Sequence, residues 1–383
     1  MTTRSASIVA EDSEASSVEE LLEEAKEVHR RKIFLNYKGL AALPAELVLD
    51  DQTFRHLEHM YLKRNLLKTL PTNIGNLKGL VELYLHSNNL TSLPDEISNL
   101  TNLQSLDVSN NQLKSLPSSL GQINTLEKLF LADNSIAALP RELGDLPNLR
   151  VLEASCNRLT CIPRELSKCG QLRSLNLINN QLQWLPRQLT DLMELEELTV
   201  SGNMLSFLPM DLGLWQERLR TVYVDNNPLL YALPFSLWKK KIGATKCGVG
   251  DIPANQFRSK HVVQANGLTA ILPPALRVVN DGKEAGRVLP LQELCFAAAH
   301  NFKDKLDLSV LPRSLYDLAE APTAHCMAPS CLARPLFTVA WVHLLKLDWA
   351  QPWQRAADSV GFVGLCCSKE CLRTFKKIPV PTF

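Results

Sequence analysis

The amino-acid sequence predicts a solenoid of the α/β class, in which short repeats stack on one another and share one parallel sheet. Two ladders of residues support this prediction. An asparagine recurs every 23 residues from Asn65 to Asn203, with a last step of 24 to Asn227, and prolines run beside it from Pro44 to Pro234. A fixed period of this size means that each repeat buries its apolar side only against its neighbours. The ladder asparagines are Asn65, Asn88, Asn111, Asn134, Asn157, Asn180, Asn203 and Asn227.

Residues 80–102 show what one repeat contains. Leucines, Asn88 and the Leu93-Pro94 step follow the pattern L-x-x-L-x-L-x-x-N-x-L-x-x-L-P, which is the signature of a leucine-rich repeat. The same frame fits nine times over residues 33–238, with Lys38 in place of the asparagine in the degenerate first unit. The sequence therefore predicts nine leucine-rich repeats.

Each recurring position of the repeat pattern has a structural role. The L-x-L step predicts a short strand whose leucines face the core, and successive strands pair in parallel to line a concave face. The asparagine amide can satisfy backbone groups where the chain leaves the strand. The L-P step favours an extended or tightly turned return, and a 23-residue unit argues against full α-helices there. These residues are interpreted as structural.

The L-P-x-x-[I/L] form of the repeat resembles the intracellular Ras-group leucine-rich repeats of signalling scaffolds. This resemblance covers residues 33–238. It implies a leucine-rich repeat fold and a scaffold that binds another protein, and it does not indicate which one.

Composition and cysteine placement bound the class of protein. A length of 383 residues is enough for one solenoid and a second small domain, and a net charge of +1 argues against nucleic acid or an anionic membrane as partner. No stretch approaches the ~20 apolar residues of a membrane span. Five of the ten cysteines crowd into residues 326–371, with none in the N-terminal flank where secreted repeats carry disulfides. We therefore expect a cytoplasmic protein.

The segments around the repeats have simpler interpretations. Residues 1–16 are predicted to be disordered. Residues 17–32 are predicted to form a helix that caps the first repeat, because Leu22 and Ala25 lie on one apolar face of it. Residues 239–288 contain scattered glycine and proline, and we expect an irregular cap over the open end of the sheet.

Six side chains of the concave face form a candidate surface for a protein partner. Three aromatic residues occupy the same position on consecutive strands, about 5 Å apart, and arginine and histidine lie beside them. Such aromatic and arginine side chains are typical of binding hot spots. The alternative is that the rings pack beneath the helix of residues 17–32. The six residues are Phe34, His59, Tyr61, Arg64, Tyr84 and His86.

The sequence offers no arrangement of residues for catalysis. It contains no Ser/His/Asp combination and no glycine-rich phosphate loop, and the two histidines of the concave face lack a partner at a fixed spacing. We therefore expect a protein that is not an enzyme.

Residues 289–320 contain two amphipathic patterns that follow prolines. The pair resembles a SOCS or VHL box, on the matches of Leu291, Cys295 and Ala299 in the first helix and Leu311 and Pro312 in the second part. The resemblance implies docking to elongin B and C and to a cullin. It implies a substrate-recruiting adaptor of a ubiquitin ligase. Two alternatives stay open: the helices only cap the solenoid, or the protein is a non-ligase signalling scaffold whose arc binds a small GTPase or a phosphatase.

Residues 321–383 are predicted to form a small α+β domain of zinc-finger type. Two cysteine pairs about 35 residues apart suit tetrahedral zinc, which favours four thiolates in structural sites. The Cys-Ser-x-x-Cys run resembles the knuckle of FCS-type zinc fingers, and a domain of this size needs such a staple. The alternative is unliganded thiols. The predicted ligands are Cys326, Cys331, Cys367 and Cys371, with His325 and Cys366 as alternates.

Overall fold

A computed structural model describes residues 17–49, 52–249, 262–265, 268–274, 276–278, 323–328, 331, 335–336, 339–345, 355–356, 361–366 and 368–376. The chain forms two compact units, Met1–Asn157 and Arg158–Phe383. None of the helices in these ranges is long and apolar enough to cross a membrane.

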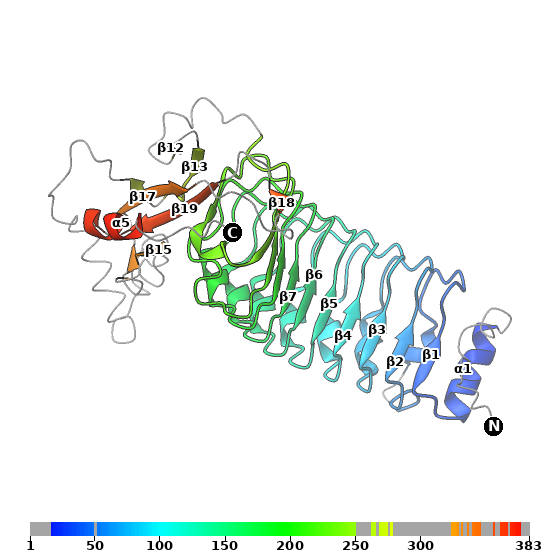
Figure 1. Ribbon diagram of the computed structural model, residues 1–383. Coiled ribbons are helices and arrows are strands. Elements are labelled where there is room, and N and C mark those ends of the chain that lie inside the picture. Colours follow the sequence, from blue (N-terminus) through cyan, green and yellow to red (C-terminus); the bar gives the residue numbers. More distant parts are fainter. Residues whose placement is uncertain are drawn as a thin grey trace, which may run out of the picture. The chain divides into compact units, whose positions relative to one another are not determined.

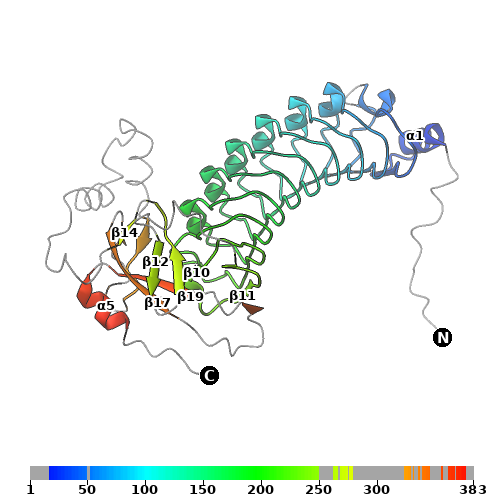
Figure 2. The same cartoon turned by 90° about the horizontal axis from the view of Figure 1, so that it is seen from above.

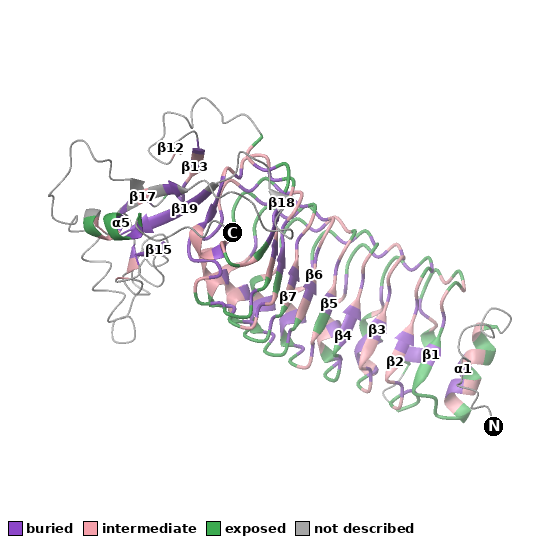
Figure 3. Ribbon diagram, viewed as in Figure 1, coloured by how far each residue is buried: buried purple, intermediate pink, exposed green. Residues whose placement is uncertain are grey.

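The first unit contains a parallel sheet of short strands in chain order (Figure 1). The central residue of each strand is buried and the two beside it are more open, as Ile33, Met60 and Leu83 show with 3 % exposure or less (Figure 3). This alternation confirms the predicted repeat strands. The strands of this unit are β1 (Lys32–Phe34), β2 (His59–Tyr61), β3 (Glu82–Tyr84), β4 (Ser105–Asp107), β5 (Lys128–Phe130) and β6 (Val151–Glu153).

The return segments are short 3₁₀ helices, which confirms that a 23-residue repeat leaves no room for α-helices there (Figure 2). Each of them begins directly after a ladder proline in an extended or near-extended conformation, such as Pro94 with φ −72° and ψ 153°. They are η1 (Ala45–Val48), η2 (Thr72–Asn76), η3 (Asp95–Asn99), η4 (Ser118–Gln122) and η5 (Arg141–Asp145) in the first unit, and η6 (Arg164–Lys168) and η7 (Arg187–Asp191) in the second.

Each ladder asparagine joins two repeats through its side-chain amide. In Asn111 the amide nitrogen donates to the carbonyls of Leu85, Val108 and Ser109 at 3.0–3.1 Å. The amide oxygen accepts from the backbone N–H of Leu90 at 2.9 Å. The buried Leu90 N–H depends on this amide, and the Leu85 and Val108 carbonyls each accept from a second ladder asparagine as well, Asn88 and Asn134 respectively. The predicted structural role of the asparagines is therefore confirmed.

The residue before each ladder asparagine adopts a left-handed backbone conformation, a feature that the sequence did not predict. The φ angles lie between 52° and 68°, although only one of the residues is glycine. For a residue with a Cβ this conformation costs about 1 kcal/mol or more, which the hydrogen bonds of the adjacent asparagine offset. The residues are Arg64, Ser87, Asn110, Asp133 and Cys156 in the first unit and Asn179, Gly202 and Asn226 in the second.

Helix α1 (Val18–Glu27) lies at the β1 edge of the first unit. Ser17 and Glu20 form a capping box at its N-terminus, in which each side chain accepts from the other's backbone N–H. Leu22 and Ala25 are buried beneath it. The carbonyl of Ala25 lies 3.1 Å from the Nε2 atom of His56.

The second unit begins with three repeat strands, β7 (Ser174–Asn176), β8 (Glu197–Thr199) and β9 (Thr221–Tyr223). A further parallel strand, β11 (Lys241–Ala244), pairs with β9, and β18 (Arg355–Ala356) pairs with β11. The described part of the predicted cap at residues 239–288 thus contains a strand that continues the repeat sheet. Ile242 and Ala244 are buried core residues of β11, a pattern too short to distinguish in the sequence.

A second sheet, of four strands, follows in the order β10 (Ala232–Pro234), β19 (Gly361–Cys366), β17 (Val339–Leu345) and β14 (Arg277–Val278). Its strands therefore come from both sides of residues 289–320. The remaining elements are η8 (Phe235–Leu237), the hairpin of β12 (Val262–Ala265) with β13 (Leu268–Ile271), the pair of β15 (Ala324–His325) with β16 (Pro335–Leu336), and helix α5 (Lys369–Phe375).

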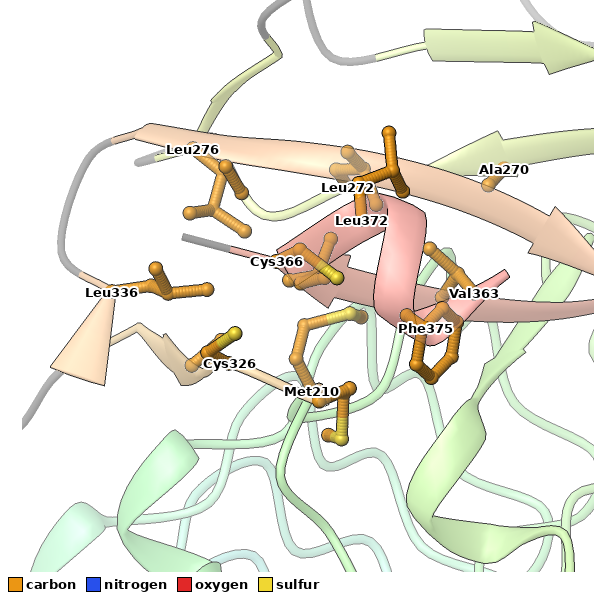
Figure 4. Close-up of a cluster of buried hydrophobic side chains, with 14 of the residues drawn as sticks. Met210, Ala270, Leu272, Leu276, Cys326, Leu336, Val363, Cys366, Leu372 and Phe375 are labelled. Atoms are coloured by element: carbon orange, nitrogen blue, oxygen red, sulfur yellow. The ribbon is translucent and has the colours of Figure 1, made fainter. Parts of the chain in front are cut away.

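Buried apolar side chains from β13, β19 and α5 join these elements into one core (Figure 4). Ala270, Val363, Leu372 and Phe375 belong to it, and Met210 from the last repeats packs against the same cluster. The residues predicted to dock elongin, Leu291, Cys295, Ala299, Leu311 and Pro312, lie outside the described residues, as do residues 1–16.

Removal of one ladder amide is expected to destabilise the repeats strongly. Asn111→Ala leaves the buried Leu90 N–H without its partner and removes one of two asparagine donors from the Leu85 and Val108 carbonyls, so the free energy of unfolding should fall by about 2 kcal/mol in urea denaturation. Asn102→Ala is the matched control, because exposed Asn102 makes one bond, to the Lys78 carbonyl at 2.8 Å. It should lose less than about 1 kcal/mol. Equal losses in the two variants would contradict the role given to the ladder.

Candidate functional site

Three aromatic rings form a continuous stack on the solvent-facing side of strands β1 to β3. The ring centroids of Phe34 and Tyr61 are 4.7 Å apart with planes at 10°, and those of Tyr61 and Tyr84 are 5.0 Å apart at 6°. The parallel register places these residues directly opposite one another, one strand spacing apart. We call Phe34, Tyr61, Tyr84 and the polar side chains on their flanks the aromatic face.

The aromatic face is open to solvent on one side. Phe34 is 36 % exposed, and Tyr61 and Tyr84 are half-buried by their mutual stacking. Helix α1 packs at the β1 edge and reaches His56, so the exposure of Phe34 argues against the alternative that the rings lie beneath this helix. The stack is therefore a surface that a partner can reach.

Charged side chains flank the stack. The Nζ atom of Lys63 lies 4.8 Å from the ring centroid of Tyr84 and 6.0 Å from that of Tyr61, a cation–π arrangement. The Nδ1 atom of His59 lies 2.8 Å from Oε2 of Glu82, directly opposite it on β3. His59 and Glu82 are one 23-residue repeat apart, so the period that aligns the rings also aligns this pair, although no partner was predicted for the histidines.

The other two predicted surface residues lie beside the stack rather than in it. The guanidinium of Arg64 sits 5.5 Å from the ring centroid of Tyr37, because the left-handed turn at Arg64 points it toward the preceding repeat. The Nδ1 atom of His86 lies 3.1 Å from the hydroxyl of Ser87. Burial, with the nearby positive charges of Lys63 and Arg64, lowers the pKa of His86, so its ring is neutral at pH 7.

The cysteines of the second unit form a separate cluster. The Sγ atoms of Cys326, Cys331 and Cys371 all lie within 4.8 Å of one another, so they could hold a metal ion. The backbone N–H of Cys331 donates to the carbonyl of Ala328 at 2.9 Å, which forms a tight turn. The N–H of Cys371 donates to the hydroxyl of Ser368, the N-cap of α5, at 3.1 Å. Three of the four predicted ligands therefore meet, and Cys367 lies outside the described residues.

The two alternates for the metal site behave differently. Cys366 is fully buried at the end of β19, and a hydrogen bond with the Cys326 thiol, together with burial, raises the pKa of its thiol far above the usual value. His325 faces elsewhere: its Nδ1 atom and its backbone N–H each lie 2.8 Å from a carboxylate oxygen of Asp211. This pair connects β15 to the last repeats, and it engages the Nδ1 atom of His325 with a carboxylate rather than with the cysteine cluster.

Comparison with known proteins agrees with the fold. Residues 51–169 match the family described as leucine-rich repeat region, and residues 147–205 match leucine rich repeat. The leucine-rich repeat domain of the type III effector XCV3220 (XopL) aligns with 58 % of this chain and 79 % of its own, at 24 % identity and a TM-score of 0.52. It supports the fold alone.

Two receptors give partial matches, the first of them from a plant. The peptide hormone receptor RGFR1, solved in complex with RGF2, covers 52 % of this chain at 28 % identity and a TM-score of 0.47, and the match spans 33 % of that receptor. A TDR receptor covers 52 % at 32 % identity and a TM-score of 0.47, over 36 % of its length. The chain thus spans about a third of the length of these receptors.

The fold and the matches together define a leucine-rich repeat domain at residues 51–205. Such domains generally bind proteins and are typically scaffolds without enzymatic activity.

The hydroxyls of Tyr61 and Tyr84 should lose their protons at a higher pH than an exposed tyrosine does. Burial, followed by the negative charge of Glu82, raises the pKa of Tyr61 and Tyr84 above their usual value of 10.0. The folded state favours the neutral phenols, so their contribution to stability is complete below pH 10 and is lost as pH rises through the folded-state pKa. A phenolate absorbance titration, as the difference between the unchanged chain and a Tyr61→Phe, Tyr84→Phe variant, should show a midpoint above pH 10.

Glu82→Gln provides the control for this titration, because it removes the charge and keeps the size of the side chain. It should move the midpoint toward lower pH. A midpoint at or below 10.0 in the unchanged chain would show that the hydroxyls are not desolvated as the stack requires.

Proposed function

We propose that this protein is an intracellular scaffold that binds a protein partner with the aromatic face, on the concave side of its repeats. The observation that carries the proposal is the stack of Phe34, Tyr61 and Tyr84, whose ring planes lie within 10° of parallel. Three solvent-accessible rings in register have no evident task in holding the repeats together, because the leucines of the same strands already fill the core.

The physical properties of the face favour a protein as partner. Rings already held in place by neighbouring strands lose little conformational entropy on binding, and they offer large apolar area. Lys63 and the His59–Glu82 pair supply both signs of charge within the same surface. A partner surface that places an apolar anchor on the rings and a carboxylate near Lys63 would satisfy both elements.

Truncation of the rings should abolish binding to the partner. Tyr61→Ala with Tyr84→Ala removes the centre of the stack, and hot-spot residues of this kind each contribute about 2 kcal/mol or more, so affinity should fall more than about 30-fold. Partners recovered by affinity purification with the unchanged chain would be identified and their dissociation constants measured against both forms.

The control for this measurement is Trp184→Ala, which removes an aromatic side chain that is 48 % exposed outside the aromatic face. It should leave partner binding unchanged, with circular dichroism establishing that both variants are folded. Equal binding by the double variant and the unchanged chain would move the binding site away from the aromatic face.

The more specific form of the proposal is a substrate-recruiting adaptor of a cullin–elongin ubiquitin ligase. Its support is the resemblance of residues 289–320 to a SOCS or VHL box, carried by Leu291, Cys295 and Ala299. In this form the aromatic face recruits the substrate and residues 289–320 contact elongin B and C. The alternative is a non-ligase signalling scaffold of the Ras-group type.

Co-purification distinguishes these two forms. The adaptor predicts that elongin B and C copurify with the full chain and are lost from a Leu291→Ser, Cys295→Phe variant of equal solubility, since both changes fall on the apolar stripe of the helix. Absence of elongin from the unchanged chain would leave the signalling scaffold.

We also propose a cytoplasmic location and a structural zinc ion in the cysteine cluster. Thiolates are the ligands that structural zinc prefers, and the three Sγ atoms within 4.8 Å fit a tetrahedral ion. Metal analysis of the purified chain should give about one zinc per chain, and chelation should lower the melting temperature, because metal binding energy contributes to folding. A metal-free chain whose melting temperature is unaffected by added zinc would contradict this.

A further inference from the structure

We propose that Cys366 supplies the fourth thiolate of the metal site, in place of Cys367, and that the ion joins three separate segments of the second unit. This inference rests on the zinc ion proposed above and concerns which residues hold it. It changes the ligand set that the sequence spacing alone favours.

The packing of α5 on β19 shows which side chains face the cluster. A Cβ atom added to Gly364 would lie 2.4 Å from ring atoms of Phe375, so helix α5 covers the face of β19 to which residue 364 belongs. Side chains alternate along a strand, which gives Cys366 the same face as residue 364. Cys371 precedes Phe375 by one helical turn and thus shares its side of α5. The alternation along β19 and the helical turn of α5 thus direct Cys366 and Cys371 toward the space between these two elements.

The segment that carries Cys326 lies beside the end of β19. The backbone N–H of Met327 donates to the carbonyl of Leu365 at 2.8 Å, which sets Cys326 alongside Cys366. Both side chains are fully buried in the same apolar cluster. The turn at Ala328 then returns Cys331 to the cluster.

The donor set fits zinc better than a harder cation. The Sγ atoms of Cys326, Cys331 and Cys371 lie within 4.8 Å of one another, close to the spacing of about 3.8 Å between thiolates that each lie about 2.3 Å from a tetrahedral ion. The Sγ atom of Cys366 lies outside this group of three, so its side chain must rotate toward them when the ion binds. On binding, the ion replaces the thiol protons, which pass to solvent. Four thiolates fill all the positions of a tetrahedral ion, so the site would leave no open position for a reacting water and would be structural.

Cobalt(II) tests this ligand set directly, because tetrahedral cobalt–thiolate absorption reports both geometry and sulfur count. The full chain, Cys366→Ser and Cys367→Ser are titrated with the metal alone. We expect the unchanged chain and Cys367→Ser to give the same spectrum. Cys366→Ser should lose about a quarter of the charge-transfer intensity, since one of four sulfurs is gone, and bind zinc more than about 100-fold more weakly.

Cys366→His keeps the test decisive if the serine variant does not fold. Imidazole can replace a thiolate at zinc, so this variant should keep tetrahedral absorption with reduced charge transfer. Loss of intensity in Cys367→Ser with a normal Cys366→Ser would overturn the proposal in favour of Cys367. Identical spectra for all the variants would also overturn it. No cobalt absorption in the unchanged chain would instead remove the zinc site itself.

Discussion

The ladder asparagines are the interaction on which the rest of the molecule depends. A chain that leaves a three-residue strand must turn at once, and in this protein it turns through a residue with positive φ that is rarely glycine. The buried carbonyls and N–H groups at that turn have no partners in a sheet or helix. The side-chain amide of a ladder asparagine provides these hydrogen-bond partners, as Asn111 does for groups on two successive repeats. Each repeat is therefore locked to the one before it.

This fixed geometry converts a one-dimensional pattern into a surface. Because every repeat leaves its strand at the same point, the residues after the buried Ile33, Met60 and Leu83 come into register, and three aromatic rings stack. The stability of the scaffold comes from the leucines and asparagines, whereas the outward positions are free to vary. Binding chemistry can thus be placed on β1 to β3 without cost to the core.

The sequence predicts the repeats and the rings because both are periodic, and a period is visible without knowledge of packing. It misses features that depend on packing between distant segments. His59 and Glu82 are one repeat apart, so the period could have paired them, whereas His325 meets Asp211 only because β15 lies against the last repeats. Strand β11 was missed because its buried residues are too few for a period. Sequence spacing also does not show which face of β19 is covered by α5, so it does not distinguish Cys366 from Cys367 as a ligand.

Site-specific photocrosslinking can show whether the aromatic face contacts a protein partner. Benzoylphenylalanine at position 61 keeps an aromatic ring in the stack, and the same group in place of exposed Gln122, in η4 on the return side, serves as the control. If the aromatic face binds the partner, the chain labelled at position 61 should form a covalent adduct with one partner, and the chain labelled at position 122 should form none. An adduct of that partner with the position 122 label alone would contradict it.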